Sequence, residues 1–210
     1  MANAPLRTPL LCARAVVAVT GSIGALWAAQ FVLELRMRRL VGDVRVVMTA
    51  SAAKIITPVA MRAMSGFDVL TDTLDVDAPF PVSHIQITDG AGVLIVMPAT
   101  ANILGKAANA IADEAVSSVI LAAECPVVFV PNMHQRMWRN PLVQRNVARL
   151  RHAGHHVIEP IEGRSISTAT YSVGGMPPFD AIVDAVRAAL PRRPRRRSAR
   201  HARQHQRRPR

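Results

Sequence analysis

Cysteine is scarce in this sequence: its 210 residues include only Cys12 and Cys125. Their spacing fits neither a zinc site nor a disulfide framework, so a disulfide-stapled secreted domain is not expected. We therefore predict no metal site and a protein of a reducing compartment, the cytoplasm. A chain of this length can bury a sizeable core without such staples, which favours one domain, with or without a tail.

An uninterrupted apolar leader is also lacking. The run over residues 10–29 superficially resembles a signal peptide, but Arg14, Gly21 and Gly24 interrupt it. We expect a strand and a helix here in place of an exported leader, and we expect no membrane association.

Acidic residues are absent from the last stretch, residues 191–210, PRRPRRRSARHARQHQRRPR, which contains ten arginines. The formal net charge of +12 thus leaves +2 for the other 190 residues. A segment so rich in arginine and proline cannot bury enough apolar surface to offset its folding entropy. This predicts a domain over residues 1–190 and a disordered tail over residues 191–210. The tail could bind nucleic acid or an acidic peptide through its charge, but we favour a solvated tail over a nucleic-acid partner.

The most informative stretch is GVLIVMPATANILGKAANAIAD, residues 92–113. Five apolar residues before Pro98 predict a buried strand that ends at the proline, because proline cannot donate to a strand ladder. The residues that follow keep near-helical apolar spacing as far as Ala112, which predicts a helix beginning at Thr100 or Asn102. Open α/β sheets bind ligands at such strand-to-helix turns. An ordinary capped turn without a ligand would leave the same pattern.

Strand-like and helix-like segments alternate along the rest of the chain. We expect strands at residues 15–20, 44–48, 68–70, 93–97, 127–130 and 156–158, helices at 25–39, 142–153 and 179–190, and short helices around 52–65. This rhythm predicts an α/β fold with a three-layer parallel sheet. Residues 72–82, which include two prolines, should form a loop that leads to Ser83-His84-Ile85.

Small polar residues stand at three of the predicted strand ends: Gly21 with Ser22, Thr49 with Ser51, and Thr100 with Asn102. The first pair lacks the full GxGxxG pattern, so it is a weak signal when taken alone. A glycine and a serine at a helix start nevertheless let a phosphate approach backbone N–H groups closely. We therefore expect a phosphate-bearing cofactor across the carboxyl edge of the sheet.

Four motifs together resemble those of the homo-oligomeric flavin-containing cysteine decarboxylases: Ser83-His84-Ile85, PATAN at residues 98–102, Asp113, and PNMHQRMW at residues 131–138. The resemblance covers roughly residues 13–190. The pattern PNMxxRMWxNPxxQxN continues to Asn146 and is most similar to the peptidyl-cysteine decarboxylases of lantibiotic and related ribosomal-peptide pathways. The resemblance implies a Rossmann-like, flavodoxin-like fold and bound FMN, with FAD as the alternative. It also implies active sites between the subunits of a homotrimer, with a dodecamer as a larger assembly.

The family's catalytic base falls on His84. The imidazole of histidine has a pKa of about 6.5, and its neutral form can take the proton of a thiol whose pKa is about 8.5. A lone loop histidine would otherwise be interpreted as a surface or core residue. The expected cofactor-binding residues are Gly21, Ser22, Ile23, Thr49, Ser51, Pro98, Ala99, Thr100, Ala101 and Asn102.

His134 departs from the family pattern. Relatives usually have an asparagine here, a carboxamide expected to bind the substrate carboxylate, and a histidine can donate to a carboxylate as well. We therefore count His134 with His84 as a candidate catalytic residue. The residues expected to contact substrate are Asn132, Met133, Met137, Trp138 and Tyr171. Met137 and Trp138 could equally be core residues.

Residues 162–178, EGRSISTATYSVGGMPP, align with the family's substrate clamp, and their composition suits a mobile lid or a hairpin. Phosphopantothenoylcysteine decarboxylases carry a cysteine there that helps to reduce the product, whereas this sequence has none after Cys125. The sequence therefore predicts an enzyme that oxidatively decarboxylates the C-terminal cysteine of a ribosomal precursor peptide to an aminoenethiol.

Three alternatives remain open. The nearest is a phosphopantothenoylcysteine decarboxylase of coenzyme A biosynthesis, which the missing cysteine and the lack of a fused ligase domain in this sequence disfavour. A flavin prenyltransferase would share the fold without this pair of histidine and methionine–tryptophan motifs. A non-enzymatic flavoprotein that binds nucleic acid through its arginine tail belongs to a different functional class.

Overall fold

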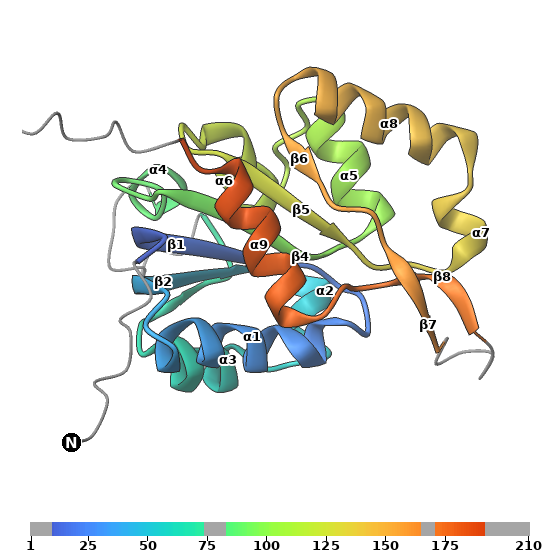
Figure 1. Cartoon of the computed structure of the whole chain (residues 1–210). Helices are drawn as coiled ribbons and strands as arrows, with labels where there is room; N and C mark the ends of the chain where they lie inside the picture. The colour runs from blue at the N-terminus through green and yellow to red at the C-terminus, as the bar shows by residue number, and fades with distance from the viewer. Residues whose placement is uncertain (1–9, 74–82, 165–170, 192–210) are drawn as a thin grey trace, which may run out of the picture.

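The protein is described by a computed structural model over residues 10–73, 83–164 and 171–191 (Figure 1). The elements in chain order are β1 (Cys12–Val19), α1 (Ala25–Met37), β2 (Val41–Met48), α2 (Ala50–Ala53), α3 (Pro58–Ser65), β3 (Val69–Leu70), α4 (Ser83–Gln86), β4 (Val93–Ala99), α5 (Ala101–Ala108), α6 (Ala115–Ala122), β5 (Val127–Pro131), α7 (Gln135–Trp138), α8 (Pro141–His152), β6 (His156–Val157), β7 (Ile161–Arg164), β8 (Tyr171–Gly175) and α9 (Phe179–Ala189).

A parallel sheet with the order β3-β2-β1-β4-β5-β6 forms the middle layer. Strand order reverses between β1 and β4, which is where open α/β sheets of this type bind ligands. The hairpin of β7 and β8 stands apart from this sheet. The predicted α/β fold with a three-layer parallel sheet is confirmed.

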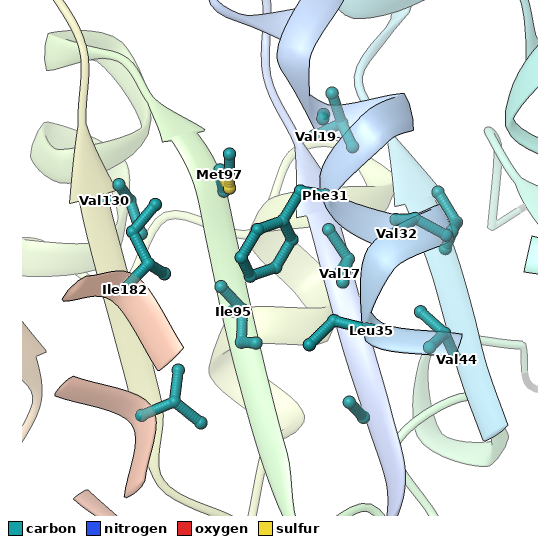
Figure 2. Close-up of a cluster of buried hydrophobic side chains, with 14 of the residues drawn as sticks. Val17, Val19, Phe31, Val32, Leu35, Val44, Ile95, Met97, Val130 and Ile182 are labelled. Atoms are coloured by element: carbon teal, nitrogen blue, oxygen red, sulfur yellow. The ribbon is translucent and has the colours of Figure 1, made fainter. Parts of the chain in front are cut away.

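Helices cover both faces of the sheet, so its central strands are buried on both sides. Along β1, Val17 and Val19 belong to the core beneath α1, α3 and α9, whereas Val16 and Ala18 belong to the core beneath α5, α6 and α8. In Figure 2 the Phe31 ring of α1 lies over β1 and β4. Burial on both faces explains why these strands have continuous apolar sequences without polar alternation.

The strand before the central turn does not end at Pro98, as expected, but continues to Ala99. Pro98 stands where the register between β4 and β5 shifts, between Val96 and Ala99, and β1 pairs with β4 only as far as Val96. Its missing N–H therefore removes no regular ladder bond, which is why proline is tolerated there.

The helix that follows β4 ends at Ala108 and not at Ala112. Ala110 adopts a left-handed backbone with φ of 55°, and the Ile111 N–H returns to the carbonyl oxygen of Lys106 at 2.9 Å. The apolar spacing of the next residues thus continues by coincidence, because Ile111 is largely exposed.

A further helix, α6, was not predicted. It begins after Glu114, whose side chain forms a reciprocal capping box with Ser117. The Lys106 ammonium lies 2.8 Å from both Asp113 and Glu114 and ties α5 to the start of α6. Asp113 therefore serves this link between two helices in the structure.

Two other predicted segments differ in detail. Ser83-His84-Ile85, to which the predicted loop leads, lies on the short helix α4, and the stretch between the strand predicted at 127–130 and the helix predicted at 142–153 contains α7. Residues 162–178 form a hairpin where they are described, in agreement with one of the two predicted forms. Residues 74–82 of the predicted loop and residues 192–210 of the predicted tail lie outside the described residues.

Candidate active site

A buried threonine joins the ends of β1 and β4. The Thr20 hydroxyl donates to the carbonyl oxygen of Pro98 at 2.6 Å, and the Thr100 N–H donates to the Thr20 hydroxyl at 3.2 Å. Thr20 is 1% exposed, so these bonds are shielded from water. The sequence interpretation missed this residue, although it is the last residue before Gly21. It holds the two strand ends together where the strand order reverses.

Helix N-termini surround this point. Thr100 caps α5 through the Ile103 N–H at 3.3 Å, and Thr49 caps α2 through the Ala52 N–H at 3.1 Å. The N-terminus of α1 has no side-chain cap, and the first turns of α1 and α5 contain no acidic residue. Unneutralised N–H groups and helix dipoles at one edge make an environment that favours a phosphate.

Gly21 lies directly against Ser51, as expected from their positions at neighbouring strand ends. A Cβ atom at Gly21 would overlap the Ser51 side chain and lie 3.1 Å from its carbonyl carbon. Only glycine therefore lets the turns after β1 and β2 approach this closely. The side chains of Ile23, Ser51 and Asn102 are exposed at this edge, and those of Ser22 and Ala101 are partly exposed.

Pro98 and Ala99 have buried side chains, and the fold uses their carbonyl groups. The Pro98 oxygen accepts from Thr20, and the Ala99 oxygen accepts from the Asn132 N–H at 3.1 Å. These two residues shape the crevice, whereas Thr100 and its neighbours offer the polar groups.

Asn132 connects this crevice to the hairpin. The Ser22 hydroxyl donates to Asn132 Oδ1, and Asn132 Nδ2 donates to the carbonyl oxygen of Gly174 at 3.0 Å. The Met133 N–H donates to the same oxygen at 3.3 Å. Gly174 has φ of 144°, and a Cβ atom there would overlap the Met133 oxygen. The hairpin is thus fastened to the residues that follow β5.

His134 caps α7 with its imidazole. The Arg136 N–H donates to His134 Nδ1 at 3.2 Å, so this ring nitrogen must be unprotonated and the neutral ring carries its proton on Nε2. An asparagine here could accept the same bond with its oxygen and donate with its amide nitrogen. Histidine and asparagine therefore present the same pair of groups, an acceptor for the helix and a free donor.

The remaining candidate substrate contacts have different environments. Met137 is 49% exposed and Met133 is partly buried, so both offer surface near the hairpin. Trp138 is 6% exposed and packs in the core beneath α5 and α8, so it holds α7 in place and has little surface to offer a substrate. The side chain of Tyr171 lies outside the described part of the chain.

His84 lies at the other edge of the sheet. Arg14 ties the turn after α4 to the start of β1, because its guanidinium donates to the Asp89 oxygen at 2.7 Å and its carbonyl accepts from the Gly92 N–H at 2.9 Å. From Arg14 to Thr20, β1 rises about 20 Å. Figure 1 shows α4 near the amino ends of β1 and β2, with the β7–β8 hairpin at the opposite end.

One chain therefore does not bring His84 to the crevice. The His84 imidazole is partly buried, and its Nδ1 atom is buried without a hydrogen-bond partner among the described residues. Such an unpaired atom carries a desolvation cost unless another group reaches it.

A model of the Flavoprotein family matches residues 5–190. The chain belongs to this family. Its relatives include the coenzyme A biosynthesis bifunctional protein CoaBC of Bacillus subtilis, 39% identical over 75% of this chain and 37% of the relative. A probable phosphopantothenoylcysteine decarboxylase of Streptococcus mutans is 32% identical over 83% of this chain and 97% of its own length. This flavoprotein spans about two fifths of the length of the bifunctional relatives.

Solved structures similar to this flavoprotein include the FMN-dependent cysteine decarboxylase SpaF, with 37% identity, a TM-score of 0.73, and coverage of 85% of this chain and 98% of SpaF. MrsD from Bacillus sp. HIL-Y85/54728 has 29% identity, a TM-score of 0.72, and coverage of 84% and 95%. A PPC decarboxylase variant complexed with pantothenoylaminoethenethiol has 27% identity, a TM-score of 0.72, and coverage of 83% and 96%. The predicted family, the flavin-dependent cysteine decarboxylases, is confirmed.

The crevice of this flavoprotein fits a phosphate-bearing flavin. Gly21 is pressed against Ser51 so that no side chain fills the turn, and the first turns of α1 and α5 contain no carboxylate. Among the described ranges, no group of three or more potential metal ligands occurs. Within those same ranges, no helix is both long and apolar enough to cross a bilayer.

Proposed function

We propose that this flavoprotein oxidatively decarboxylates the C-terminal cysteine of a ribosomal precursor peptide. The observation that carries the proposal is the thiol-free hairpin: no cysteine occurs after Cys125, so the clamp has no thiol to return electrons to an unsaturated product. The peptide would lose carbon dioxide and two hydrogens and would keep an aminoenethiol at its new end. The similarity to SpaF, an FMN-dependent cysteine decarboxylase, supports the decarboxylation of a cysteine.

The residues divide the work by chemistry. His84 takes the thiol proton, because a neutral imidazole is a competent base for a thiol. The His134 Nε2–H binds the substrate carboxylate, with its orientation fixed by the bond from the Arg136 N–H to Nδ1. The N–H groups of the crevice hold the flavin phosphate, and we expect FMN. A bound flavin supplies the two-electron acceptor for the hydride that leaves the cysteine Cβ.

The proposed site is shared between two copies of the chain. His84 and the crevice lie at opposite edges of a sheet whose β1 strand rises about 20 Å between Arg14 and Thr20. A base at that separation cannot reach a substrate held at the crevice of the same copy. We therefore propose a homo-oligomer, a trimer, in which one copy supplies His84 and its neighbour supplies the crevice, His134 and the hairpin.

Decarboxylation of phosphopantothenoylcysteine is the second candidate function. Several curated relatives at 36–39% identity are bifunctional coenzyme A biosynthesis proteins, which favours this substrate. The two reactions differ in their final oxidation state. A reduced product has lost carbon dioxide alone, whereas the unsaturated product has also lost two hydrogens.

Mass spectrometry separates the two functions. Flavin-loaded protein would be incubated with a cysteine-terminated peptide and, separately, with phosphopantothenoylcysteine, and a peptide ending in serine would serve as the control. We expect the cysteine peptide to lose about 46 Da, the mass of carbon dioxide and two hydrogens, because the electrons stay on the flavin. An unchanged peptide together with a loss of about 44 Da from phosphopantothenoylcysteine would overturn the proposal in favour of coenzyme A biosynthesis.

A further inference from the structure

A hollow of about 500 Å³ opens between α5 and α8, which lie side by side on one face of the sheet (Figure 1). Its wall includes Arg145, Arg149 and His152 of α8 and His155, which precedes β6. Alanine and leucine side chains of the two helices form the rest of its lining. The hollow lies at the amino edge, because α5 runs away from the crevice and His155 leads into β6. It is therefore separate from the crevice at the carboxyl edge.

The charge of this hollow is unbalanced. Arg145 and Arg149 lie four residues apart on one face of α8, where like charges repel one another, and His152 continues that face. Among the described residues, none that lines the hollow is acidic. Arg151, on another face of the same helix, pairs with Glu159 at 2.6 Å. Within the described part of the chain, α8 thus has a carboxylate partner on one face and none at the hollow.

One of the two guanidinium groups is held in place without being neutralised. The Arg149 Nη1 atom donates to Asn109 Oδ1 at 2.7 Å, and Asn109 Nδ2 donates to the Gly105 oxygen at 2.8 Å. An amide fixes the orientation of a cation as a carboxylate would, but it leaves the positive charge available. This arrangement is that of a preorganised anion receptor.

Favourable interaction with the α8 dipole explains only some of the positions of the basic residues on this helix. Cations in a last helical turn are favourable, which accounts for Arg149 and His152. Arg145 lies nearer the middle of the helix, where the dipole has little effect. Burial, together with the neighbouring His156, lowers the pKa of His155, so its neutral ring adds a hydrogen-bond donor.

We infer that the hollow binds a small organic phosphate, with the phosphate on Arg145 and Arg149 and an apolar or planar group on the alanine and leucine lining. Its volume lies within the range of small-molecule pockets, about 300–1,000 Å³. Planar guanidinium forks suit a phosphate monoester because they can donate two parallel bonds. A nucleoside monophosphate has both required parts.

Calorimetric titration of the full-length, flavin-loaded protein with AMP tests the inference. The variant R145Q/R149Q keeps helix propensity and removes the receptor. The matched control R62Q/R187Q removes the same charge from two exposed arginines that pair with Asp68 and Asp184. We expect R145Q/R149Q to weaken AMP binding about tenfold or more, because hydrogen bonds to charged groups are stronger than those between neutral groups, and the control to leave it unchanged.

Asn109→Asp makes the test sharper. The aspartate is isosteric and can still orient Arg149, but it neutralises the charge, so AMP binding should again fall about tenfold while the circular dichroism spectrum stays the same. The tail arginines are present in every variant and cannot produce a difference between them. Failure of the native protein to bind AMP, or equal weakening in R62Q/R187Q, would overturn the inference. If single-stranded RNA bound through the same two arginines while AMP did not bind, the hollow would be part of a surface for polyanions instead.

Discussion

The two edges of the parallel sheet are built from different chemistry. The carboxyl edge has small residues, threonine caps and free N–H groups around Gly21 and Thr100. The amino edge has charged and titratable groups: the ion pair of Arg14 with Asp43, His84, whose Nδ1 has no partner among the described residues, and the Cys12 thiol, whose pKa burial raises to about 11. The crevice and His84 therefore lie at opposite edges within one chain, and under the proposed function a neighbouring copy would bring them together.

Subunit complementation is the largest effect we expect from this separation. His84→Asn should bind flavin yet lose flavin reduction by a cysteine-terminated peptide about 10²–10⁴-fold, since the base is gone. Gly21→Asp, which brings a carboxylate into the crevice and against Ser51, should be colourless. When the two inactive variants are co-expressed in equal amounts and assemble at random, about a quarter of the interfaces between copies should combine an intact His84 with an intact crevice. These interfaces should recover activity.

Anaerobic bleaching of the flavin would measure this recovery directly. Tagging each variant differently allows mixed assemblies to be purified, and mixing the proteins without co-assembly provides the control. An inactive mixed assembly, with both variants folded, would contradict a site that is shared between two copies.

His134 should tolerate one replacement and not another. His134→Asn preserves both the acceptor for the Arg136 N–H and the outward donor, so peptide KM and thermal stability should remain close to native. His134→Leu removes the helix cap, worth about 1 kcal/mol, and the carboxylate donor, worth about 1.5–3 kcal/mol. We therefore expect a lower Tm and a KM raised about tenfold or more. An inactive His134→Asn would show that the imidazole has a role that an amide cannot fill.

Asn132 should control the attachment of the hairpin. Asn132→Ala removes its bonds to Ser22 and Gly174, each contributing about 1 kcal/mol, and should speed hydrogen exchange in β8. Asn140→Ala is the matched control, because the Asn140 side chain accepts from the Leu142 N–H and so caps α8. Equal acceleration in both variants would mean that the loss is global and that the hairpin is held by other contacts.

The smallest expected effect is a pH dependence of stability from the amino edge. Burial first, and then the nearby His156, lower the pKa of His155, so the unfolded chain binds a proton more readily than the folded one. The free energy of unfolding should have its full value above about pH 6.5, and it should decrease as the pH drops below that value. Urea denaturation across this range measures the slope. His155→Phe, which keeps an aromatic ring near Phe129, should flatten it, whereas His152→Gln should not.

Local patterns predicted the layers well because the central strands β4 and β5 are buried along their whole length and have continuous apolar sequences. A helix end that is not marked by glycine or proline was not predicted. Ala110 ends the α5 region with a positive φ that nothing in its side chain favours, so α6 beyond it was missed. At Pro98 the strand was predicted to end too early. Proline is excluded from a strand because it lacks an N–H for the ladder, but the register shift leaves no regular ladder bond at this position.

The candidate site was predictable where residues act through the backbone of their own turn, as Gly21 and Thr100 do. Contacts between distant segments were not. Thr20 was overlooked because its partner, the Pro98 carbonyl, is contributed by another strand. The position of His84 at the far edge depends on the bond between Arg14 and Asp89, which leaves no trace in either local sequence.

The contact between Gly174 and Met133 limits which hairpins can be grafted onto this fold. A grafted hairpin would need glycine at this position, since any Cβ atom would overlap the Met133 oxygen, and a carbonyl placed to accept from Asn132. Chimeras that transplant a whole hairpin without that glycine should misdock. Exchanging only the sequence between β7 and β8 would keep both contacts and, under the proposed function, would test which peptides are accepted.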